Sequence, residues 1–356
     1  MATNSKIEIA FVWTDIRKPS GGADYFLLDV LRSLRFINFA NYEISVKVYD
    51  INDELSLIKE LNNYDIVVMN SLNKSLALIP FINVPVLIDV HYPDWLQYFR
   101  EKELGIKPRP GARLRRGWLR FLGRRVYCRV LNKFDYEVFS KYCKEVFLIP
   151  NFIDTKIFYP SASKAKDFTV IIRYDEYIKN GFHIFLKALK FLGKSRWLNI
   201  VIIGKEPPHS ILRVIHQLSN DVVTLGRVAN REQLVNIYSM AHTTIIPSLY
   251  ESFSLIALES LACGTPIIMS RLPPIAWYLK EITIKSPGTG LAFQPANPLD
   301  LAEKIRIMYE IWSQYGDIYY NSIVTSRKIA EKFDVKRILP IYLKTIINIA
   351  NKINLK

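Results

Sequence analysis

Short apolar runs alternate with longer amphipathic segments along most of the chain. The runs are four to seven residues long and rich in β-branched side chains, which is typical of buried strands. In the first half they cover residues 7–13, 44–49, 66–70, 84–90, 136–140 and 146–149. In the second half they cover residues 168–172, 198–203, 222–225, 243–246 and 266–269, and helical patterns lie at residues 183–192, 211–218 and 232–240. The alternation predicts an α/β protein with parallel sheets, because parallel strands need crossover segments between them.

The alternation is interrupted once, near the middle of the chain. There, residues 159–167 (YPSASKAKD) are small, polar and proline-bearing, which is typical of a linker. The length of 356 residues suits two ordinary domains. We therefore expect two Rossmann-like domains, residues 1–150 and 151–333, that face each other across a ligand cleft, and a C-terminal helix at residues 334–356.

The chain contains three widely spaced cysteines, Cys128, Cys143 and Cys263. Such a small, odd number excludes a disulfide framework and a cysteine-based zinc cluster. We expect three free thiols, which would suit a reducing cytosol.

Neither a signal peptide nor a transmembrane helix is predicted. The first thirteen residues lack a basic start, an apolar core and a small-residue cleavage site. No stretch of about 18 residues is both apolar throughout and free of charge, and the longest candidate, residues 338–353, contains Pro340 and two lysines. These features favour a cytoplasmic protein that is at most peripheral at the inner membrane face.

Positive charge is concentrated in one strip of the chain. The formal net charge is +15, and residues 100–133 contain twelve Lys or Arg and two Glu, with apolar residues at roughly helical spacing. Three interpretations of a basic amphipathic helix remain open here. It could be an ordinary solvated face, a contact for anionic lipid headgroups or a lipid-linked phosphate, or a nucleic-acid surface. Nucleic acid is disfavoured, because no recognised binding motif accompanies the charge.

Residues 247–268 (PSLYESFSLIALESLACGTPII) carry the most chemical information. Ser252 is a suitable N-cap for a helix over residues 253–262, and Gly264 suits its C-terminal end. Glu251 precedes this helix and Glu259 lies two turns inside it, about 12 Å further along the axis. The first backbone N–H groups would form an anion site, contributed by Phe253, Ser254 and Leu255. A nucleoside diphosphate sugar requires such a site, in which the phosphates bind to N–H groups and carboxylates on either side accept hydrogen bonds from sugar hydroxyls.

This motif, with Glu251 and Glu259 separated by seven residues, resembles the signature of the family 4 retaining glycosyltransferases of GT-B fold. The first loop has no G-x-G-x-x-G and the chain has no P-loop motif, which disfavours dinucleotide and P-loop enzymes. Further segments resemble the family in order and spacing: Gly21-Gly22, Val90-His91, Ile149-Pro150-Asn151 with Asp154, Arg173 with Lys179 and Gly181, Gly226-Arg227-Val228, and Gly290-Leu291.

The resemblance implies a role for each matched residue. His91 and Glu251 would act at the reacting sugar, and Glu259 would accept hydrogen bonds from the ribose. The remaining donor-binding positions would be Arg173, Lys179, Phe253, Ser254, Leu255, Val228, Gly21 and Gly22. Neither a metal nor a cofactor is expected, since the nucleotide sugar is a substrate. The partner would be a glycan or lipid-linked hydroxyl acceptor, and the last helix would return to the N-terminal domain, as in family members.

The sequence departs from the family pattern at several positions. Ser252 and Ser254 stand where the family usually has glycine, Asn180 separates Lys179 from its glycine, and Phe152 replaces another glycine. These changes put the family's usual donor preference in doubt. Two alternatives are a non-catalytic basic protein that binds membrane or nucleic acid, and a GT-B sugar-nucleotide epimerase. The order of the motifs disfavours the epimerase. The presence of Arg173, Lys179, Glu251 and Glu259 together disfavours a protein without catalytic chemistry.

Overall fold

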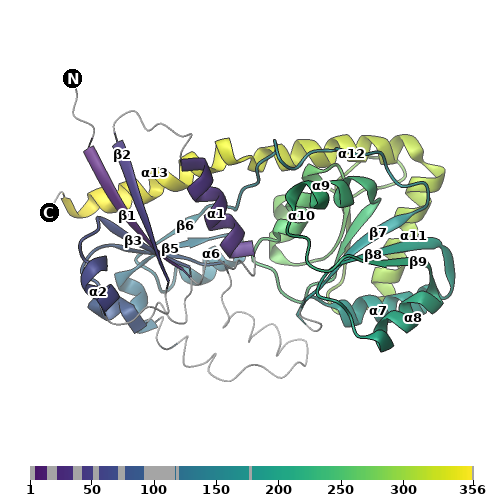
Figure 1. Ribbon diagram of the computed structural model, residues 1–356, viewed down its shortest axis with the longest axis horizontal. Coiled ribbons are helices and arrows are strands. Elements are labelled where there is room, and N and C mark those ends of the chain that lie inside the picture. The colour runs from purple at the N-terminus through teal and green to yellow at the C-terminus, as the bar shows by residue number, and fades with distance from the viewer. Residues whose placement is uncertain are drawn as a thin grey trace. The chain divides into compact units, whose positions relative to one another are not determined.

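The chain folds into two compact units. The computed structural model describes residues 5–13, 22–34, 42–50, 56–70, 77–91, 117, 120–175 and 179–354. One unit consists of Met1–Phe152 together with Val335–Lys356, and the other of Ile153–Asp334. Each unit holds a six-stranded sheet in which all pairs are parallel. The predicted α/β class and parallel sheets are therefore confirmed (Figure 1).

The N-terminal unit has the strand order β2-β1-β3-β4-β5-β6. Its strands are β1 (Ser5–Trp13), β2 (Tyr42–Asp50), β3 (Ile66–Met69), β4 (Val86–Asp89), β5 (Tyr127–Val130) and β6 (Glu145–Leu148). Its helices with described bounds are α1 (Gly22–Leu34), α2 (Ser56–Leu61), α6 (Lys133–Phe139) and α13 (Val335–Asn354), with the 3-10 turns η1 (Ile79–Phe81) and η2 (Gly123–Arg125).

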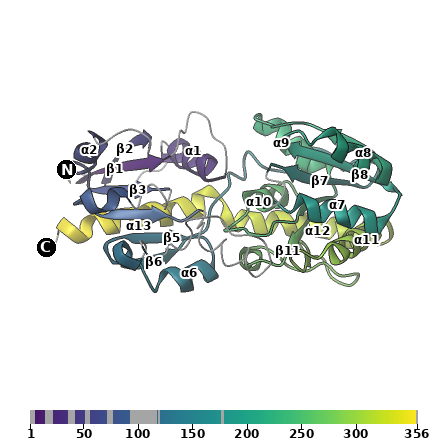
Figure 2. The same cartoon turned by 90° about the horizontal axis from the view of Figure 1, so that it is seen from below.

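Helices α1 and α13 supply much of the core of this unit. In α13, Leu339, Leu343 and Ile346 recur every three or four residues, so they lie on one side of the helix, where all are fully buried. They join Phe11 of β1 and Phe26 of α1 in one cluster. Each such side chain contributes about 1.5–3 kcal/mol by burial. The last helix of the chain therefore packs with the first strands, as Figures 1 and 2 show.

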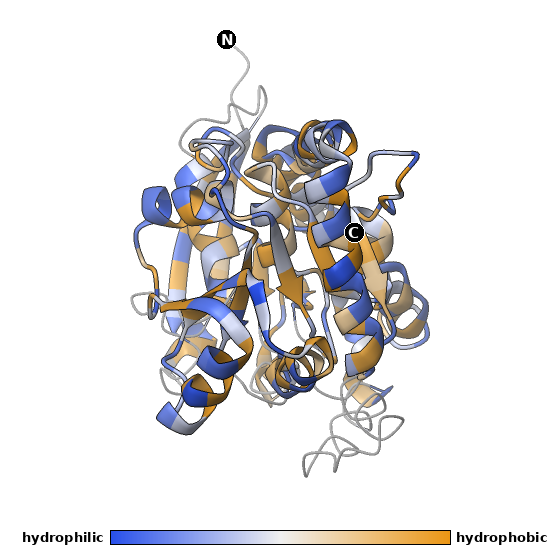
Figure 3. Ribbon diagram, turned by 90° about the vertical axis from the view of Figure 1, so that its right-hand side faces the viewer, coloured by the Kyte–Doolittle hydropathy of each residue, from blue (hydrophilic) through white to orange (hydrophobic). Residues whose placement is uncertain are grey.

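The C-terminal unit has the strand order β12-β11-β10-β7-β8-β9. Its strands are β7 (Thr169–Tyr174), β8 (Ser195–Gly204), β9 (Ser219–Thr224), β10 (Thr243–Ile246), β11 (Ile267–Ser270) and β12 (Gly290–Phe293). Its helices are α7 (Phe182–Leu192), α8 (His209–Leu218), α9 (Arg231–Met240), α10 (Leu255–Ala262), α11 (Pro298–Gln314) and α12 (Gly316–Ala330), with η3 (Pro273–Trp277) and η4 (Glu331–Phe333). The strands near the middle of Figure 3 are mostly orange, in keeping with the apolar runs that predicted them.

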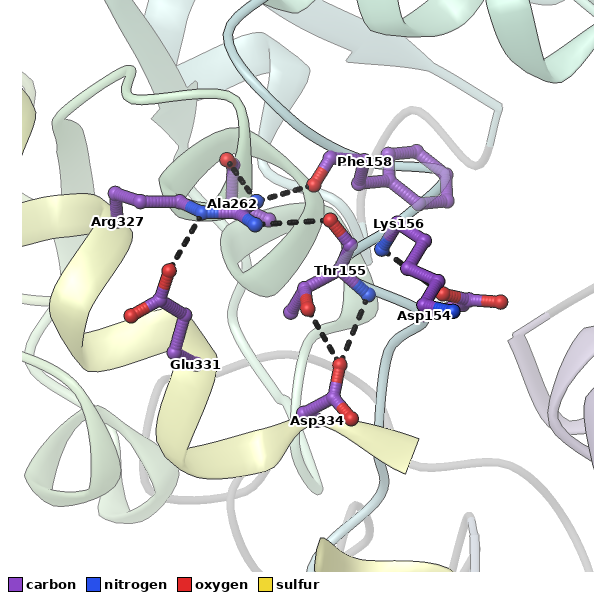
Figure 4. A network of polar contacts seen from close by, with 8 residues as sticks. All are labelled: Asp154, Thr155, Lys156, Phe158, Ala262, Arg327, Glu331 and Asp334. Atoms are coloured by element: carbon purple, nitrogen blue, oxygen red, sulfur yellow. Dashed lines mark hydrogen bonds and ion pairs between the residues drawn. The ribbon is translucent and has the colours of Figure 1, made fainter. Parts of the chain in front are cut away.

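A polar network joins the start and the end of the C-terminal unit (Figure 4). The backbone N–H of Thr155 donates to Asp334 over 3.2 Å, and the Thr155 hydroxyl donates to the same oxygen over 2.5 Å. Arg327 of α12 donates to the carbonyls of Thr155 at 2.8 Å, Phe158 at 2.5 Å and Ala262 at 3.0 Å. Since Ala262 is the last residue of α10, the network also anchors the C-terminal end of that helix.

Two predictions of local structure are wrong. Residues 136–140 lie in α6 and the turn after it, because Asn132 caps this helix by accepting a hydrogen bond from the Asp135 backbone N–H. Residues 159–167 are part of the C-terminal unit and do not act as a linker. Within them, Lys164 donates to the Ala241 carbonyl and to Thr265, both at 2.6 Å.

The expectation of three free thiols is also wrong. Cys128 of β5 and Cys143 form a disulfide, and Cys263 is free and buried. The two bonded cysteines are 15 residues apart in sequence, and the turn after α6 brings their Cα atoms to 6.3 Å. The argument from free thiols to a reducing compartment therefore loses its basis.

Most of the basic strip lies outside the described residues. Of its last part, Arg120–Leu122 are helical, η2 follows, and β5 begins at Tyr127. Two of the apolar residues at the end of the strip, Tyr127 and Val130, are thus strand residues of the sheet. Arg129, which the charge count placed in the strip, is fully buried and is not a surface charge. Where the chain is described, none of the helices has the length and apolar character needed to cross a membrane.

Candidate functional site

The site predicted from the glutamate motif lies at the switch point of the C-terminal sheet. Counted from its first strand, the unit has the order 3-2-1-4-5-6, so the crossover direction reverses between β7 and β10. Ligands of such sheets bind beyond the carboxyl ends of the strands at this point. Arg173 is the penultimate residue of β7, and residues 247–254 follow β10 directly. Topology therefore brings the two halves of the motif to one edge.

The segment containing Lys179 packs closely against the loop after β10. The Leu249 backbone N–H donates to the Lys179 carbonyl over 3.0 Å. Gly181 has φ +71°, and a β-carbon there would lie 1.7 Å from the Pro247 carbonyl oxygen. Only glycine permits both this conformation and this approach. The inserted Asn180 is therefore accommodated while Lys179 stays at the loop.

Glu251 lies among hydroxyl and cationic groups. Ser248 donates a hydrogen bond to its carboxylate over 2.9 Å. Burial raises the pKa of Glu251, while this hydrogen bond and the charges of Lys179 and Arg173 act in the opposite direction. Arg173 also forms an ion pair with Asp175. The structure therefore brings Arg173, Lys179 and Glu251 together, three residues to which the family resemblance gave roles at the donor.

Glu259 lies further along α10 and contacts a different side chain. The Tyr238 hydroxyl, from α9, donates to its carboxylate over 3.0 Å. Burial, followed by the charge of Glu259, raises the pKa of Tyr238 well above its ordinary value, and Arg173 acts in the opposite direction. The charge of Arg173 thus acts on the pKa values of both Glu251 and Tyr238.

Helix α10 begins later than predicted. Its first residue is Leu255 and its N-cap is Ser254, whereas Ser252 was expected to cap it. The Ser252 hydroxyl is instead hydrogen-bonded to the Tyr250 hydroxyl over 3.0 Å. The C-terminal end agrees with expectation, since Gly264 has φ +73° and follows the last turn. The predicted anion-binding N–H groups of Phe253, Ser254 and Leu255 therefore lie just before and at the first turn.

The remaining donor-binding predictions lie elsewhere. Val228 follows β9 and is half-buried, and the Gly226 carbonyl of the same loop accepts from the Gly204 N–H at the end of β8 over 2.8 Å. Gly22 is the first residue of α1, while Gly21 lies outside the described residues. Both Val228 and Gly22 come after strands in the chain, and Gly22 belongs to the N-terminal unit.

His91 belongs to the N-terminal unit, two residues beyond β4. Its Nε2 lies 3.9 Å from an Asp89 carboxylate oxygen, which is beyond hydrogen-bonding distance. Its ring contacts Trp13 and Phe26, with centroid distances of 5.8 and 5.1 Å. Burial lowers the pKa of His91, although Asp89 acts in the opposite direction. Nε2 has no hydrogen-bond partner within the described part of the chain.

A buried ion pair stands behind His91. Arg129 donates to Asp89 over 2.8 Å, and both side chains are fully buried. The Tyr342 hydroxyl donates to the second Asp89 oxygen over 2.6 Å. The Arg129 guanidinium lies 4.4 Å from the Phe26 ring centroid and 4.9 Å from that of Tyr342, and its remaining bonds go to Ile149, Pro150 and Asn151. Sequence reasoning missed this cluster because its members are separated by up to 253 residues.

Tyr238 and Tyr278 were also missed as parts of the glutamate site. The Tyr278 hydroxyl donates to the Phe253 carbonyl, and Tyr238 holds Glu259. Neither tyrosine falls in a recognisable motif. A buried tyrosine must find a partner for its hydroxyl, but the sequence does not show which group that partner is.

The fold and the C-terminal segment are similar to known proteins. Residues 155–323 match the family model of the Glycosyl transferases group 1, and this segment contains Arg173, Lys179, Glu251 and Glu259. Sucrose-phosphate synthase from Thermosynechococcus elongatus has a TM-score of 0.74 at 17% identity, covering 96% of this chain and 98% of that one. The Anabaena protein HepE, in complex with UDP-glucose, has a TM-score of 0.72 at 17% identity, covering 96% and 100%. The expected GT-B fold is thereby confirmed, and the group 1 resemblance is confirmed over the matched segment.

Similar sequences cover shorter segments. The MMP alpha-(1->4)-mannosyltransferase of Mycolicibacterium hassiacum is 31% identical over 130 residues, which is 36% of this chain and 32% of that protein. An uncharacterized glycosyltransferase of Methanocaldococcus jannaschii is 31% identical over 137 residues, 38% of this chain and 34% of that protein. The matches thus span about a third of the length of these relatives.

Proposed function

We propose that this protein is a glycosyltransferase that transfers a sugar from a nucleoside diphosphate donor to a hydroxyl acceptor, with retention of anomeric configuration. The observation that carries the proposal is the gathering of Arg173, Lys179 and Glu251 at the switch point of the C-terminal sheet, with Glu259 on the helix that starts there. The group 1 family match over this segment supports it. Its GT-B neighbour in complex with UDP-glucose and the mannosyltransferase relative favour a hexosyl donor.

The proposed chemistry follows from the charges at this edge. The bond between the anomeric carbon and the phosphate oxygen breaks, and a bond to the acceptor oxygen forms. Negative charge then develops on the leaving diphosphate, where Arg173, Lys179 and the first N–H groups of α10 would stabilise it. The leaving phosphate oxygen would take the proton of the acceptor hydroxyl. Glu251 would stabilise positive charge on the sugar ring, and His91 would contact the donor sugar.

Donor binding is tested with a panel of UDP-, GDP- and ADP-hexoses in a thermal-shift assay. A ligand at 100 times its Kd adds about 2.7 kcal/mol to stability, so the correct donor raises Tm by several degrees. Release of the nucleoside diphosphate from that donor then reports turnover. A protein stabilised by none of the panel would contradict the proposed function. Conversion of one nucleotide sugar to its epimer would instead identify the epimerase alternative.

We further propose that the acceptor is presented at an anionic membrane surface. A cavity of about 280 Å³ opens on the N-terminal unit between η1, η2 and the start of β5. Its lining combines an apolar floor, including Ile79 and Tyr127, with the cations Arg124, Arg125 and Lys144 and no acidic residue. The exposed Phe121 precedes Arg124 by one helical turn. Apolar and basic groups side by side are what a phosphate-bearing lipid headgroup requires.

The membrane proposal is tested by replacing Arg124, Arg125 and Lys144 with Gln. Each cation near an anionic surface contributes about 1 kcal/mol, so sedimentation with phosphatidylglycerol vesicles weakens by about two orders of magnitude. The control replaces three exposed cations of the C-terminal unit, Lys166, Lys190 and Arg213, with the same loss of charge. Equal vesicle binding by both triple variants and the wild type would show that the cavity is only a solvated surface.

A further inference from the structure

Ser254 adopts a backbone conformation that disfavours any residue with a β-carbon. Its φ is 69° and its ψ is 85°, in the left-handed region. Among the described residues only one other non-glycine residue, Ala296 at φ 61°, has a positive φ. Ser254 stands where the resembling family usually has glycine, which adopts this region without strain. A serine here needs a compensating role.

The neighbours of Ser254 hold it in this conformation. The Tyr278 hydroxyl donates to the Phe253 carbonyl, directly before Ser254. The Phe253 ring, 2% exposed, packs edge-on against Tyr278 and Phe333, with centroid distances of 5.9 and 5.8 Å. The loop is therefore pinned on one side by a hydrogen bond and two aromatic contacts. Strain of this kind persists only where the surroundings over-determine the backbone.

The Ser254 hydroxyl does not cap its own helix. Serine is a strong N-cap when its backbone is extended, because the hydroxyl then accepts a bond from an N–H of the first turn. In the left-handed conformation Ser254 makes no such bond. The residue is 7% exposed, and its Oγ has no hydrogen-bond partner among the described residues. A buried hydroxyl without a partner is costly, so the site is incomplete without another group.

We propose that the Ser254 hydroxyl donates a hydrogen bond to the sugar-proximal phosphate of the donor, beside the uncapped N–H groups of α10. This inference rests on the proposed function. The first intrahelical bond that involves Ser254 runs from the Leu258 N–H to its carbonyl over 3.4 Å, so the N–H groups of the first turn remain available to the same anion. The left-handed backbone prevents self-capping and so leaves both kinds of donor to the ligand.

The site is electrostatically suited to that phosphate. Glu251, three residues before Ser254, lies within the influence of Lys179 and Arg173. Two cations, a helix N-terminus and one hydroxyl donor therefore lie at the same edge of the sheet. Ser254 is assigned as a residue that determines affinity for the diphosphate, and it is not assigned a catalytic role.

The test compares Ser254→Ala with Ser254→Gly. Calorimetry with UDP, GDP and ADP first identifies the diphosphate that the wild type binds. Both variants then bind this diphosphate about tenfold more weakly, because both lack the hydroxyl. Both bind the monophosphate of the same base as the wild type does, since it lacks the sugar-proximal phosphate. Ser254→Gly also melts a few degrees above Ser254→Ala, because it removes the strained β-carbon.

Ala296→Gly is the matched control, since Ala296 is exposed and has the same kind of backbone strain. It raises Tm and leaves nucleotide binding unchanged. If Ser254→Ala binds the diphosphate as the wild type does, this inference is wrong while the proposed function stands. Equal weakening for the monophosphate would also overturn the assignment to the sugar-proximal phosphate. A wild type that binds none of the three diphosphates would overturn the proposed function, and this inference with it.

Discussion

Two buried polar clusters in this protein, one in each unit, differ in where their hydrogen-bond partners come from. In the N-terminal unit, the Asp89 carboxylate receives bonds from Arg129 and Tyr342, so both oxygens have protein partners. In the C-terminal unit, Glu251 receives a bond from Ser248, and the buried Ser254 hydroxyl has no described partner. The Asp89 carboxylate is satisfied by the chain itself, although the neighbouring His91 Nε2 has no described partner, whereas the second cluster leaves the Ser254 hydroxyl for a ligand.

The difference follows from where each cluster lies. Arg129 is a strand residue covered by aromatic rings, so every donor must be paired inside the protein. The Glu251 cluster lies in a loop beyond the strand ends, where α/β sheets bind ligands. We therefore expect the buried charge network around Arg129 to stabilise the fold, and the cluster around Glu251 to bind a ligand. The following predictions test this division.

The largest effect is expected for Arg129→Met. It leaves the buried Asp89 carboxylate without its cation, which destabilises the protein by about 3–5 kcal/mol. Arg124→Met, an exposed change in the same strip, costs within about 0.5 kcal/mol. Thermal unfolding of both variants is the measurement. Similar Tm values for the two variants would show that the buried pair does not support the fold.

Replacing the two glutamates of the C-terminal unit with alanine should affect different properties of the enzyme. Loss of a charged hydrogen bond costs about 1.5–3 kcal/mol, or about one to two decades in Kd. Glu259→Ala should weaken both the free nucleoside diphosphate and the intact donor, because the ribose does not react. Glu251→Ala should leave the free nucleotide almost unchanged and lower kcat, since its contact strengthens as charge develops on the sugar. Calorimetry and steady-state kinetics distinguish the two variants. If both variants lose the same affinity for the free nucleotide, the donor lies along α10 in the direction opposite to the one assigned.

The carboxylates of the two clusters should be protonated at different pH values. The pKa of Asp89 is held well below its ordinary value of 3.8, chiefly by Arg129 against the opposing effect of burial, so its stabilisation is lost only as pH falls below 3.8. The pKa of Glu251 is raised above 4.5, so this carboxylate protonates earlier. Turnover should therefore fall as pH drops toward 4.5, while circular dichroism still reports a folded protein. Loss of structure and turnover at the same pH would contradict this order.

The smallest effect is expected from removal of metal ions. Arg173, Lys179 and the start of α10 are proposed to balance the diphosphate charge, so catalysis should not need a divalent cation. Turnover measured with EDTA should equal turnover measured with added Mg²⁺ or Mn²⁺. Activity that disappears in EDTA and returns with Mn²⁺ would show that these groups are insufficient.

Local sequence predicted most of the strands correctly. The run at residues 243–246 coincides with β10, and the glycine and proline after residue 263 correctly indicated the end of α10. The predictions were wrong where a short apolar pattern is compatible with both a strand and a helix. Residues 136–140 are apolar enough for a strand, but Asn132 and Asp135 form a cap that starts a helix. Likewise, the apolar face of the basic strip continues into β5.

What the sequence by itself determined is the α/β class and the resemblance of residues 155–323 to the Glycosyl transferases group 1. Motif spacing and hydrophobic period are local, so they can be read along the chain. Only the tertiary structure decided the Asp89–Arg129–Tyr342 cluster, the Cys128–Cys143 disulfide and the left-handed backbone of Ser254. Each of these depends on residues that packing brings together, and a serine shows its lost cap only when the conformation of its backbone is known.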